Sequence, residues 1–176
     1  MSNPEPLLVG VDLGGTTLRA GLVRDGKVIA EYRVNADLST RCAQASPEQA
    51  LELVVEVLTE SITTIQKNAD SKIEAIGLSL PGYVDGDSGV IFSSPNLPGL
   101  NNADIATPLA RHFDAEIRVE NDALATTWGE FNCHPDQPEH MIYIGLGTGI
   151  GGGLILNERT LQRDSRHGHG DRAYRD

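Results

Sequence analysis

Basic residues are scarce in this sequence, which has 14 Lys or Arg among its 176 residues against 25 Asp or Glu and a formal net charge of −11. Binding to a nucleic-acid backbone depends on clustered Lys and Arg that displace counterions from the phosphates. The acidic balance therefore argues against a nucleic-acid partner and favours chemistry on small molecules.

Cysteines and long apolar runs are equally scarce. The two cysteines, Cys42 and Cys133, are far apart and have no metal-type spacing, so the chain has no disulfide framework. Residues 1–6 lack the basic-then-apolar pattern of a signal peptide, and no apolar run approaches the length of a membrane span. We therefore expect a soluble cytoplasmic protein with no membrane partner and, at 39% hydrophobic residues, one good core.

The N-terminal residues predict an antiparallel start to a sheet. An apolar run from Leu7 to Val11 ends in an acid and two glycines, which is typical of a buried strand entering a tight turn. Residues 18–23 and 28–32 follow as two further strands. The Asp25-Gly26 pair between them is a hairpin signal.

A capped helix and a parallel strand come next. Residues 46–49 combine a capping serine, a first-turn proline and a reciprocal glutamine, and apolar residues recur at helical spacing as far as Ile65. Residues 73–80 form the next predicted strand, and the order strand, helix, strand predicts a parallel pair and an α/β fold. The remaining predicted elements are strands at 90–92, 117–120, 141–146 and 154–156 and helices at 105–112 and 123–131.

An acid, two glycines and two hydroxyls stand together in the first turn, at Asp12, Gly14, Gly15, Thr16 and Thr17. Glycines let the backbone approach a polyphosphate and turn its N–H groups toward it, while an acid can hold magnesium directly or through water. An ordinary hairpin turn is the alternative, and this turn alone leaves the choice open.

A second glycine-rich loop runs from Gly147 to Gly153 and includes Thr148 and Gly149. Ordering so many glycines costs conformational freedom, so dense glycine favours a close approach of the backbone to a ligand. Two such hairpins could close on a polyphosphate from opposite sides. A flexible loop without a ligand is the alternative.

The segment Glu120-Asn121-Asp122-Ala123 lies where a predicted strand ends and a helix begins, the usual position of ligand groups in open α/β sheets. A carboxylate at Asp122 could take the proton from a sugar hydroxyl as it attacks phosphorus, with Asn121 fixing neighbouring hydroxyls. The alternative is a helix cap, with Asn121 capping and Asp122 favouring the helix dipole, which is the commoner use of such residues.

Several short motifs stand in a recognisable order along residues 7–157, namely 10–16, 80–85, 95–97, 119–123 and 146–153. Together they resemble the ROK family, which groups bacterial glucokinases and related sugar kinases with sugar-responsive repressors. The resemblance implies the ribonuclease-H-like ATPase fold shared with actin and hexokinase, an α/β fold with a mixed sheet. It further implies a first domain at 1–120 and the incomplete start of a second, similar domain at 121–157.

The resemblance implies a role for each matched residue. Asp122 would be the catalytic base, Asn121 and Gly82 would contact the sugar, and Asn96 would lie close by. It also implies a hexose or amino-hexose substrate, ATP with Mg²⁺, and a homodimer. No metal-ligand residues are predicted, because His167 and His169 stand without the further ligands that a zinc site needs. ATP and Mg²⁺ would be held through Asp12, Gly14, Gly15, Thr16, Thr17, Gly147, Thr148 and Gly149.

The sequence departs from the family pattern after Asn157. Family members continue through a segment whose Glu and His grip the sugar, and many then carry a cysteine-rich zinc motif, but neither occurs here. Residues 158–176 have almost no apolar residues and no periodicity, so we expect a non-native, disordered tail. Codons for residues 163–175 permit a shifted reading that includes the family's Ala-x-Glu-Ile-Gly-His, which predicts a frameshift that DNA sequencing at the Asn157 codon would test.

Three functions remain open at this point. The first is an ATP-dependent sugar kinase, of which this chain would be an incomplete and inactive form. The second is a sugar-responsive regulator of the same family, which would need DNA-reading helices before the first strand. The third is a non-catalytic sugar-binding fragment. The sequence does not identify the sugar.

Overall fold

The computed structural model describes residues 5–161 except 87, 137, 147 and 148. The chain divides into two compact units, Met1–Ala125 and Thr126–Asp176. The division falls inside a helix, five residues beyond the expected boundary at residue 120.

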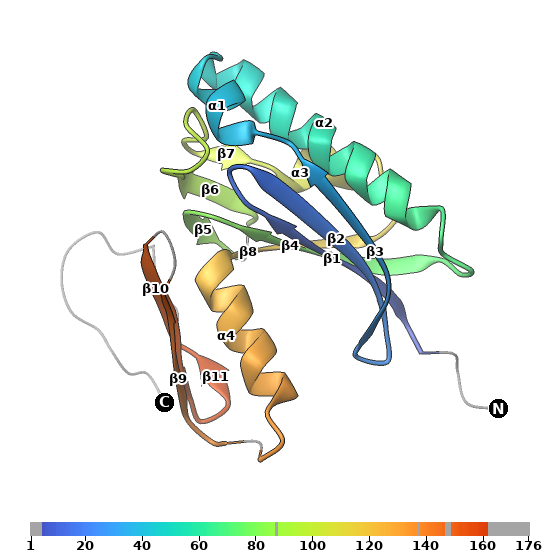
Figure 1. Ribbon diagram of the computed structural model, residues 1–176, viewed down its shortest axis with the longest axis vertical. Coiled ribbons are helices and arrows are strands. Elements are labelled where there is room, and N and C mark those ends of the chain that lie inside the picture. The colour runs from blue at the N-terminus through green and yellow to red at the C-terminus, as the bar shows by residue number, and fades with distance from the viewer. Residues whose placement is uncertain (1–4, 87, 137, 147–148, 162–176) are drawn as a thin grey trace. The chain divides into compact units, whose positions relative to one another are not determined.

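A five-stranded mixed sheet forms the centre of the first unit, in the order β3-β2-β1-β4-β8 (Figure 1). The first three strands pair antiparallel and β4 runs parallel to β1, as the sequence predicts. Strand β8 pairs parallel with β4, a direction that the sequence left open. Asp25 and Gly26 both have positive φ, at 51° and 65°, as expected for the tight turn between β2 and β3. The strands are β1 (Leu7–Leu13), β2 (Thr17–Arg24), β3 (Lys27–Asn35), β4 (Ile73–Leu80) and β8 (Glu116–Asn121).

The long helix α2 (Pro47–Gln66) contributes the main helical face of the core. Its predicted capping box is present, because Ser46 Oγ accepts from Gln49 N at 3.3 Å and Gln49 Oε1 accepts from Ser46 N at 3.0 Å. Residues at helical spacing, including Val54, Leu58 and Ile62, are fully buried among the inward side chains of the sheet. Burying each such side chain contributes about 1.5–3 kcal/mol.

Short elements that the sequence did not predict surround the carboxyl ends of the parallel strands. They are α1 (Leu38–Ala43) and two strands, β5 (Tyr83–Asp85) and β7 (Ala103–Asp104), which flank the predicted β6 (Val90–Ser93) in a three-stranded sheet. The helix predicted at 105–112 is α3 (Ala106–Ala110), so the prediction is too long. Its end tightens because Arg111 N and His112 N donate three residues back, to Pro108 O and Leu109 O.

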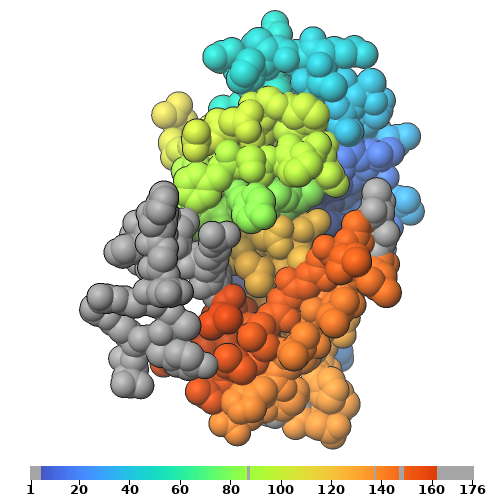
Figure 2. All heavy atoms as spheres, turned by 90° about the vertical axis from the view of Figure 1, so that its left-hand side faces the viewer, coloured from blue at the N-terminus to red at the C-terminus, as the bar shows by residue number. Residues whose placement is uncertain are grey.

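The second unit contains most of α4 (Asp122–Cys133) and a three-stranded antiparallel sheet of β9 (Met141–Leu146), β10 (Ile150–Leu156) and β11 (Arg159–Thr160). Figure 2 draws the strands of this unit in orange to red. Ile150 and three of the glycines in the predicted glycine loop are strand residues, since Ile150–Gly153 pair with residues 143–146 of β9. That part of the loop prediction is wrong.

The tail predicted to be disordered from residue 158 begins instead with a short paired strand, β11. Residues 159–160 pair with Leu156 and Ile155 of β10, and Leu161 N donates to Leu154 O at 2.8 Å. Backbone pairing needs no apolar side chains, which is why the composition gave no sign of β11. The rest of the predicted tail, including the residues of the proposed frameshift from 163 onward, lies outside the described residues.

No helix in the described part of the chain is long and apolar enough to cross a membrane.

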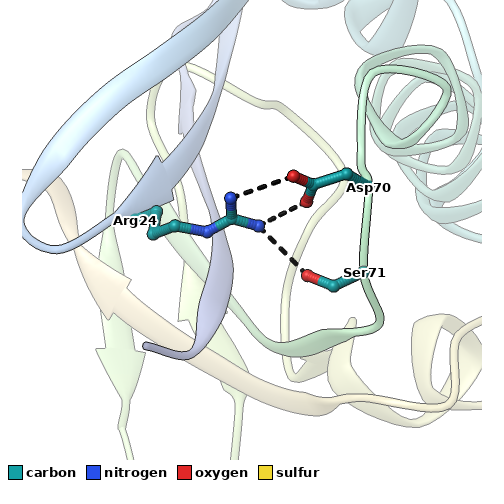
Figure 3. Close-up of polar contacts among 3 residues, drawn as sticks. All are labelled: Arg24, Asp70 and Ser71. Carbon is teal, nitrogen blue, oxygen red and sulfur yellow. Dashed lines mark hydrogen bonds and ion pairs between the residues drawn. The ribbon is translucent and has the colours of Figure 1, made fainter. Parts of the chain in front are cut away.

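A forked ion pair ties the β2–β3 hairpin to the segment between α2 and β4 (Figure 3). Arg24 Nη1 donates to Asp70 Oδ2 at 3.0 Å, while Arg24 Nη2 contacts Asp70 Oδ1 and donates to Ser71 Oγ at 3.1 Å. The hydrogen bond from Arg24 lowers the pKa of Asp70 below its ordinary value. The ionised pair therefore contributes to stability above the unfolded-state pKa of about 3.9, and this contribution is lost as pH falls through the folded-state pKa.

We expect Asp70→Asn to lower the thermal unfolding midpoint slightly at pH 7, because the exposed pair is screened by water. The difference from the wild type should begin to narrow below about pH 4, near the unfolded-state pKa, and close as pH falls through the lower folded-state pKa of Asp70. Unfolding followed by circular dichroism from pH 7 to pH 3 measures this. Glu52→Gln is the control, since Glu52 is exposed on α2 and has no ion-pair partner within the described ranges. A difference that persisted at low pH would contradict the prediction.

Candidate active site

The turn after β1 is held by its carbonyl groups and by one N–H group, since Gly14 N donates to Thr17 O at 2.9 Å. Gly15 O accepts from Ser39 N at 2.7 Å, and Thr16 O accepts from Ala36 N at 2.9 Å and Asp37 N at 3.0 Å. Among the residues that the structure describes, the Gly15 and Thr16 N–H groups have no hydrogen-bond acceptor. Adjacent unpaired backbone donors of this kind suit a phosphate oxygen, so the turn fits the predicted nucleotide phosphates.

Gly15 also brings this turn against the loop that carries Asn96. A Cβ at Gly15 would lie 3.1 Å from Asn96 O and 3.2 Å from Ser39 Cβ, which is tighter than most Cβ contacts. A larger residue at this position would have to displace these neighbours by a few tenths of an ångström. The nucleotide and sugar residues predicted from separate motifs therefore meet within the first unit.

Gly82, directly after β4, is glycine for two reasons. Its φ is +128°, a conformation that residues with a side chain rarely adopt, and a Cβ there would overlap Ser93 O and lie 2.9 Å from Ser94 Cα. Gly82 thus packs its backbone directly on the strand end that leads to Asn96.

Asn121, the last residue of β8, uses its amide in two directions. Its Oδ1 accepts from Ala123 N at 3.0 Å and Leu124 N at 3.1 Å, which is the capping role considered as the alternative reading. Its Nδ2 donates to Gly82 O at 2.7 Å and to Asp122 Oδ1 at 3.0 Å. The same side chain therefore caps α4 and links Gly82 to Asp122 in the candidate site.

Asp122 begins α4 and is exposed. Its Oδ1 accepts from Ala123 N at 2.8 Å as well as from Asn121 Nδ2, so one carboxylate oxygen is oriented by the start of the helix. A carboxylate held in this way at the end of a strand can accept a proton from a bound hydroxyl.

A row of polar residues crosses the sheet beside these groups. The strand register pairs Asp12 with Arg19 on one side and with Ser79 on the other, and pairs Ser79 with Glu120. Ser79, Arg19 and Glu120 were not predicted as site residues. Ser79 and Glu120 lie near the carboxyl ends of predicted strands and Arg19 lies near the start of one, but only the pairing register shows that they align.

The predicted residues of the second glycine loop are not all described. Gly147 and Thr148 lie outside the described residues, and Gly149 is an exposed residue just before β10. Closure of the two loops on one polyphosphate therefore stays a prediction. In β10, a Cβ at Gly153 would overlap Thr127 Oγ1 of α4, so this glycine is needed for packing within the second unit.

Comparison with known proteins identifies the family of this chain. Residues 8–170 match the ROK family, and the chain belongs to that family. It is 34% identical over 161 residues to a glucokinase of Thermotoga maritima, covering 90% of this chain and 47% of that protein. It is 25% identical over 159 residues to an N-acetylmannosamine kinase of Haemophilus influenzae, covering 90% of this chain and 48% of that protein. The chain thus spans about half the length of the curated relatives it matches.

Solved structures agree on the fold. The ROK hexokinase of Thermus thermophilus has a TM-score of 0.72 and 33% identity, covering 90% of this chain and 49% of that one. A ROK glucokinase of Streptomyces griseus, solved with glucose and AMPPNP, has a TM-score of 0.73 and 28% identity over 88% of this chain and 46% of that one. A ROK transcriptional regulator, a homologue of the Escherichia coli MLC protein, has a TM-score of 0.76 at 21% identity over 92% of this chain and 39% of that one, and shows the fold alone. The predicted ribonuclease-H-like, actin-type α/β fold is confirmed.

We expect Gly82→Ala to destabilise the chain by about 2–3 kcal/mol, because the added methyl group meets backbone atoms at a strained φ. Gly77→Ala is the matched control, since Gly77 lies in β4 and a Cβ there meets no atom within 4 Å. Urea unfolding of both variants measures the difference. Equal stability of the two variants would contradict the packing described for Gly82.

Proposed function

We propose that this chain is the front half of an ATP-dependent sugar kinase that phosphorylates a hydroxyl of a hexose or amino-hexose. The observation that carries the proposal is the hydrogen bond from Asn121 Nδ2 to Gly82 O, beside the oriented carboxylate of Asp122. It joins the ends of β4 and β8, where the family pattern expects the sugar. The glucokinase and N-acetylmannosamine kinase relatives support this substrate class.

In the proposed reaction, Asp122 would accept the proton of the sugar hydroxyl as that oxygen attacks the γ-phosphorus of ATP, and ADP would leave with the bridging oxygen. Asn121 orients Asp122, and Gly82 and Asn96 border the sugar. The N–H groups of Gly15 and Thr16 would donate hydrogen bonds to phosphate oxygens. Asp12, at the same edge of the sheet, would bind Mg²⁺ directly or through a water molecule. Bound Mg-ATP would supply the phosphoryl group and part of the charge neutralisation. We place the protein in the cytoplasm, and a homodimer is proposed from the family alone.

We propose that the chain by itself lacks kinase activity. Its second unit leaves one face of β9 and β10 apolar and open, with Ile142, Ile144, Leu146 and Ile150 between 67% and 83% exposed. The strand register places Leu146 opposite Ile150 and Ile144 opposite Gly152 on this face. An apolar sheet face of this kind is normally covered by another layer. Together with the half-length coverage of its relatives, this face supports an enzyme that needs further polypeptide.

A second candidate is a sugar-binding protein without catalysis, including a sugar-responsive regulator of the ROK family. It is supported by the fold shared with the MLC homologue and by the apolar face of the second unit. Sugar binding without turnover in a protein that contains both halves of the fold would favour it over the kinase.

Sugar binding can be tested by titrating the ¹⁵N-labelled chain with D-glucose and N-acetylmannosamine and recording amide shifts. We expect saturable shifts at Gly82, Asn96, Asn121 and Asp122, and none with L-glucose. In the same preparation, a coupled assay with Mg-ATP should show no turnover. Robust turnover would refute the proposed inactivity, and the absence of any saturable shift would refute the sugar site.

The open apolar face predicts binding of the dye ANS and self-association. We expect Ile144→Lys to reduce both while changing stability by no more than about 0.5 kcal/mol, because the side chain is 67% exposed. Fluorescence titration, light scattering and urea unfolding provide the measurements. Tyr143→Lys is the control, since Tyr143 lies half-buried on the opposite face of β9 and its replacement should destabilise the unit.

A further inference from the structure

Ser94 is a buried polar residue of the first unit, 7% exposed, at the end of β6. Its hydroxyl is fully engaged. Ser94 Oγ donates to Pro81 O at 2.6 Å and accepts from Leu97 N at 3.2 Å. One hydroxyl thus joins the end of β4 to the loop that follows β6.

The hydrogen bond from Ser94 to Pro81 O leads toward Asp122, the proposed catalytic base. Pro81 precedes Gly82, whose backbone packs on Ser93 and Ser94 and whose carbonyl oxygen accepts from Asn121 Nδ2 at 2.7 Å. Asn121 Nδ2 also donates to Asp122 Oδ1. A change at Ser94 would therefore reach the carboxylate through the two peptide units that flank Gly82 Cα and through the amide side chain of Asn121.

The second bond leads toward Asn96. Leu97 N also donates to Ser94 O at 3.3 Å, and Leu97 is fully buried, so the turn from Ser94 to Leu97 is anchored at both ends. Asn96 lies inside this turn and is exposed, with its carbonyl oxygen against Gly15. The direction of the Asn96 side chain depends on the turn.

We propose that Ser94 is a positioning residue of the sugar site, which sets Gly82 and Asn96 in register with Asn121 and Asp122 without touching the sugar. This inference rests on the proposed sugar-binding function. It goes beyond the residues that the family motifs assign, because Ser94 was identified only by its burial and its two hydrogen bonds.

A purely structural serine would behave differently. Removing its hydroxyl would leave a buried carbonyl and a buried N–H without this partner and lower the stability of the fold. Under conditions in which the variant is still fully folded, a structural role predicts no change in sugar affinity. A positioning role predicts weaker sugar binding in the folded protein.

The test compares the sugar dissociation constants of Ser94→Ala, Ser94→Cys and Ser94→Thr with that of the wild-type chain. The constants come from the amide titration with D-glucose and N-acetylmannosamine, at a temperature where each variant is fully folded. We expect Ser94→Ala and the nearly isosteric but weakly bonding Ser94→Cys to bind about tenfold more weakly, which corresponds to about 1.4 kcal/mol. We expect Ser94→Thr, which retains the hydroxyl, to restore at least part of the affinity. Hydrogen exchange at the Leu97 amide should accelerate in Ser94→Ala and Ser94→Cys.

Thr59→Val is the matched control for hydroxyl removal, because Thr59 Oγ1 is buried on α2 with no hydrogen-bond partner in the described part of the chain. This variant should leave the sugar affinity unchanged. Unaltered sugar affinity in folded Ser94→Ala would overturn the positioning role while leaving the proposed function intact. A wild-type chain that binds neither sugar would instead overturn the proposed function, and the role of Ser94 with it.

Discussion

The parallel pairing of β1, β4 and β8 is the constraint on which the site depends. Parallel neighbours end at the same edge of a sheet, so the segments after these strands emerge side by side although they are far apart in the sequence. The Asn121 to Gly82 hydrogen bond and the Gly15 contact with Asn96 then close the distances between these segments. Without the parallel register, the same motifs would have no common location.

Glycine performs different tasks in the two units. At Gly15 and Gly82 the missing side chain lets backbone segments of the site touch, whereas at Gly153 it lets a strand pack on Thr127 of α4. A dense run of glycines therefore does not by itself indicate a ligand loop. In β10 the run is partly a packing feature, because a helix approaches too closely for any Cβ.

Asn121 combines a common structural role with a proposed functional role in one side chain. A helix cap and a sugar-site residue were competing interpretations of this residue, yet its oxygen caps α4 while its nitrogen reaches Gly82 and Asp122. The amide group can do both because its oxygen accepts hydrogen bonds while its separate NH₂ group donates them. The cap also fixes where α4 begins and so orients the carboxylate at its first residue.

Local chemistry was sufficient to predict the strands at 73–80 and 141–146, the capped helix after Ser46, the hairpin at Asp25-Gly26 and the order of motifs that marks the ROK family. These features depend on periodicity, capping and turn residues within a few positions of one another. Tertiary structure alone decided that Ile150–Gly153 belong to a strand and that β11 pairs inside the expected tail. It also decided that Ser79 and Glu120 align with Asp12, and that Ser94 joins two loops. Each of these depends on which distant backbone lies next to which, and that is set by strand register and close packing, of which the linear sequence carries no local sign.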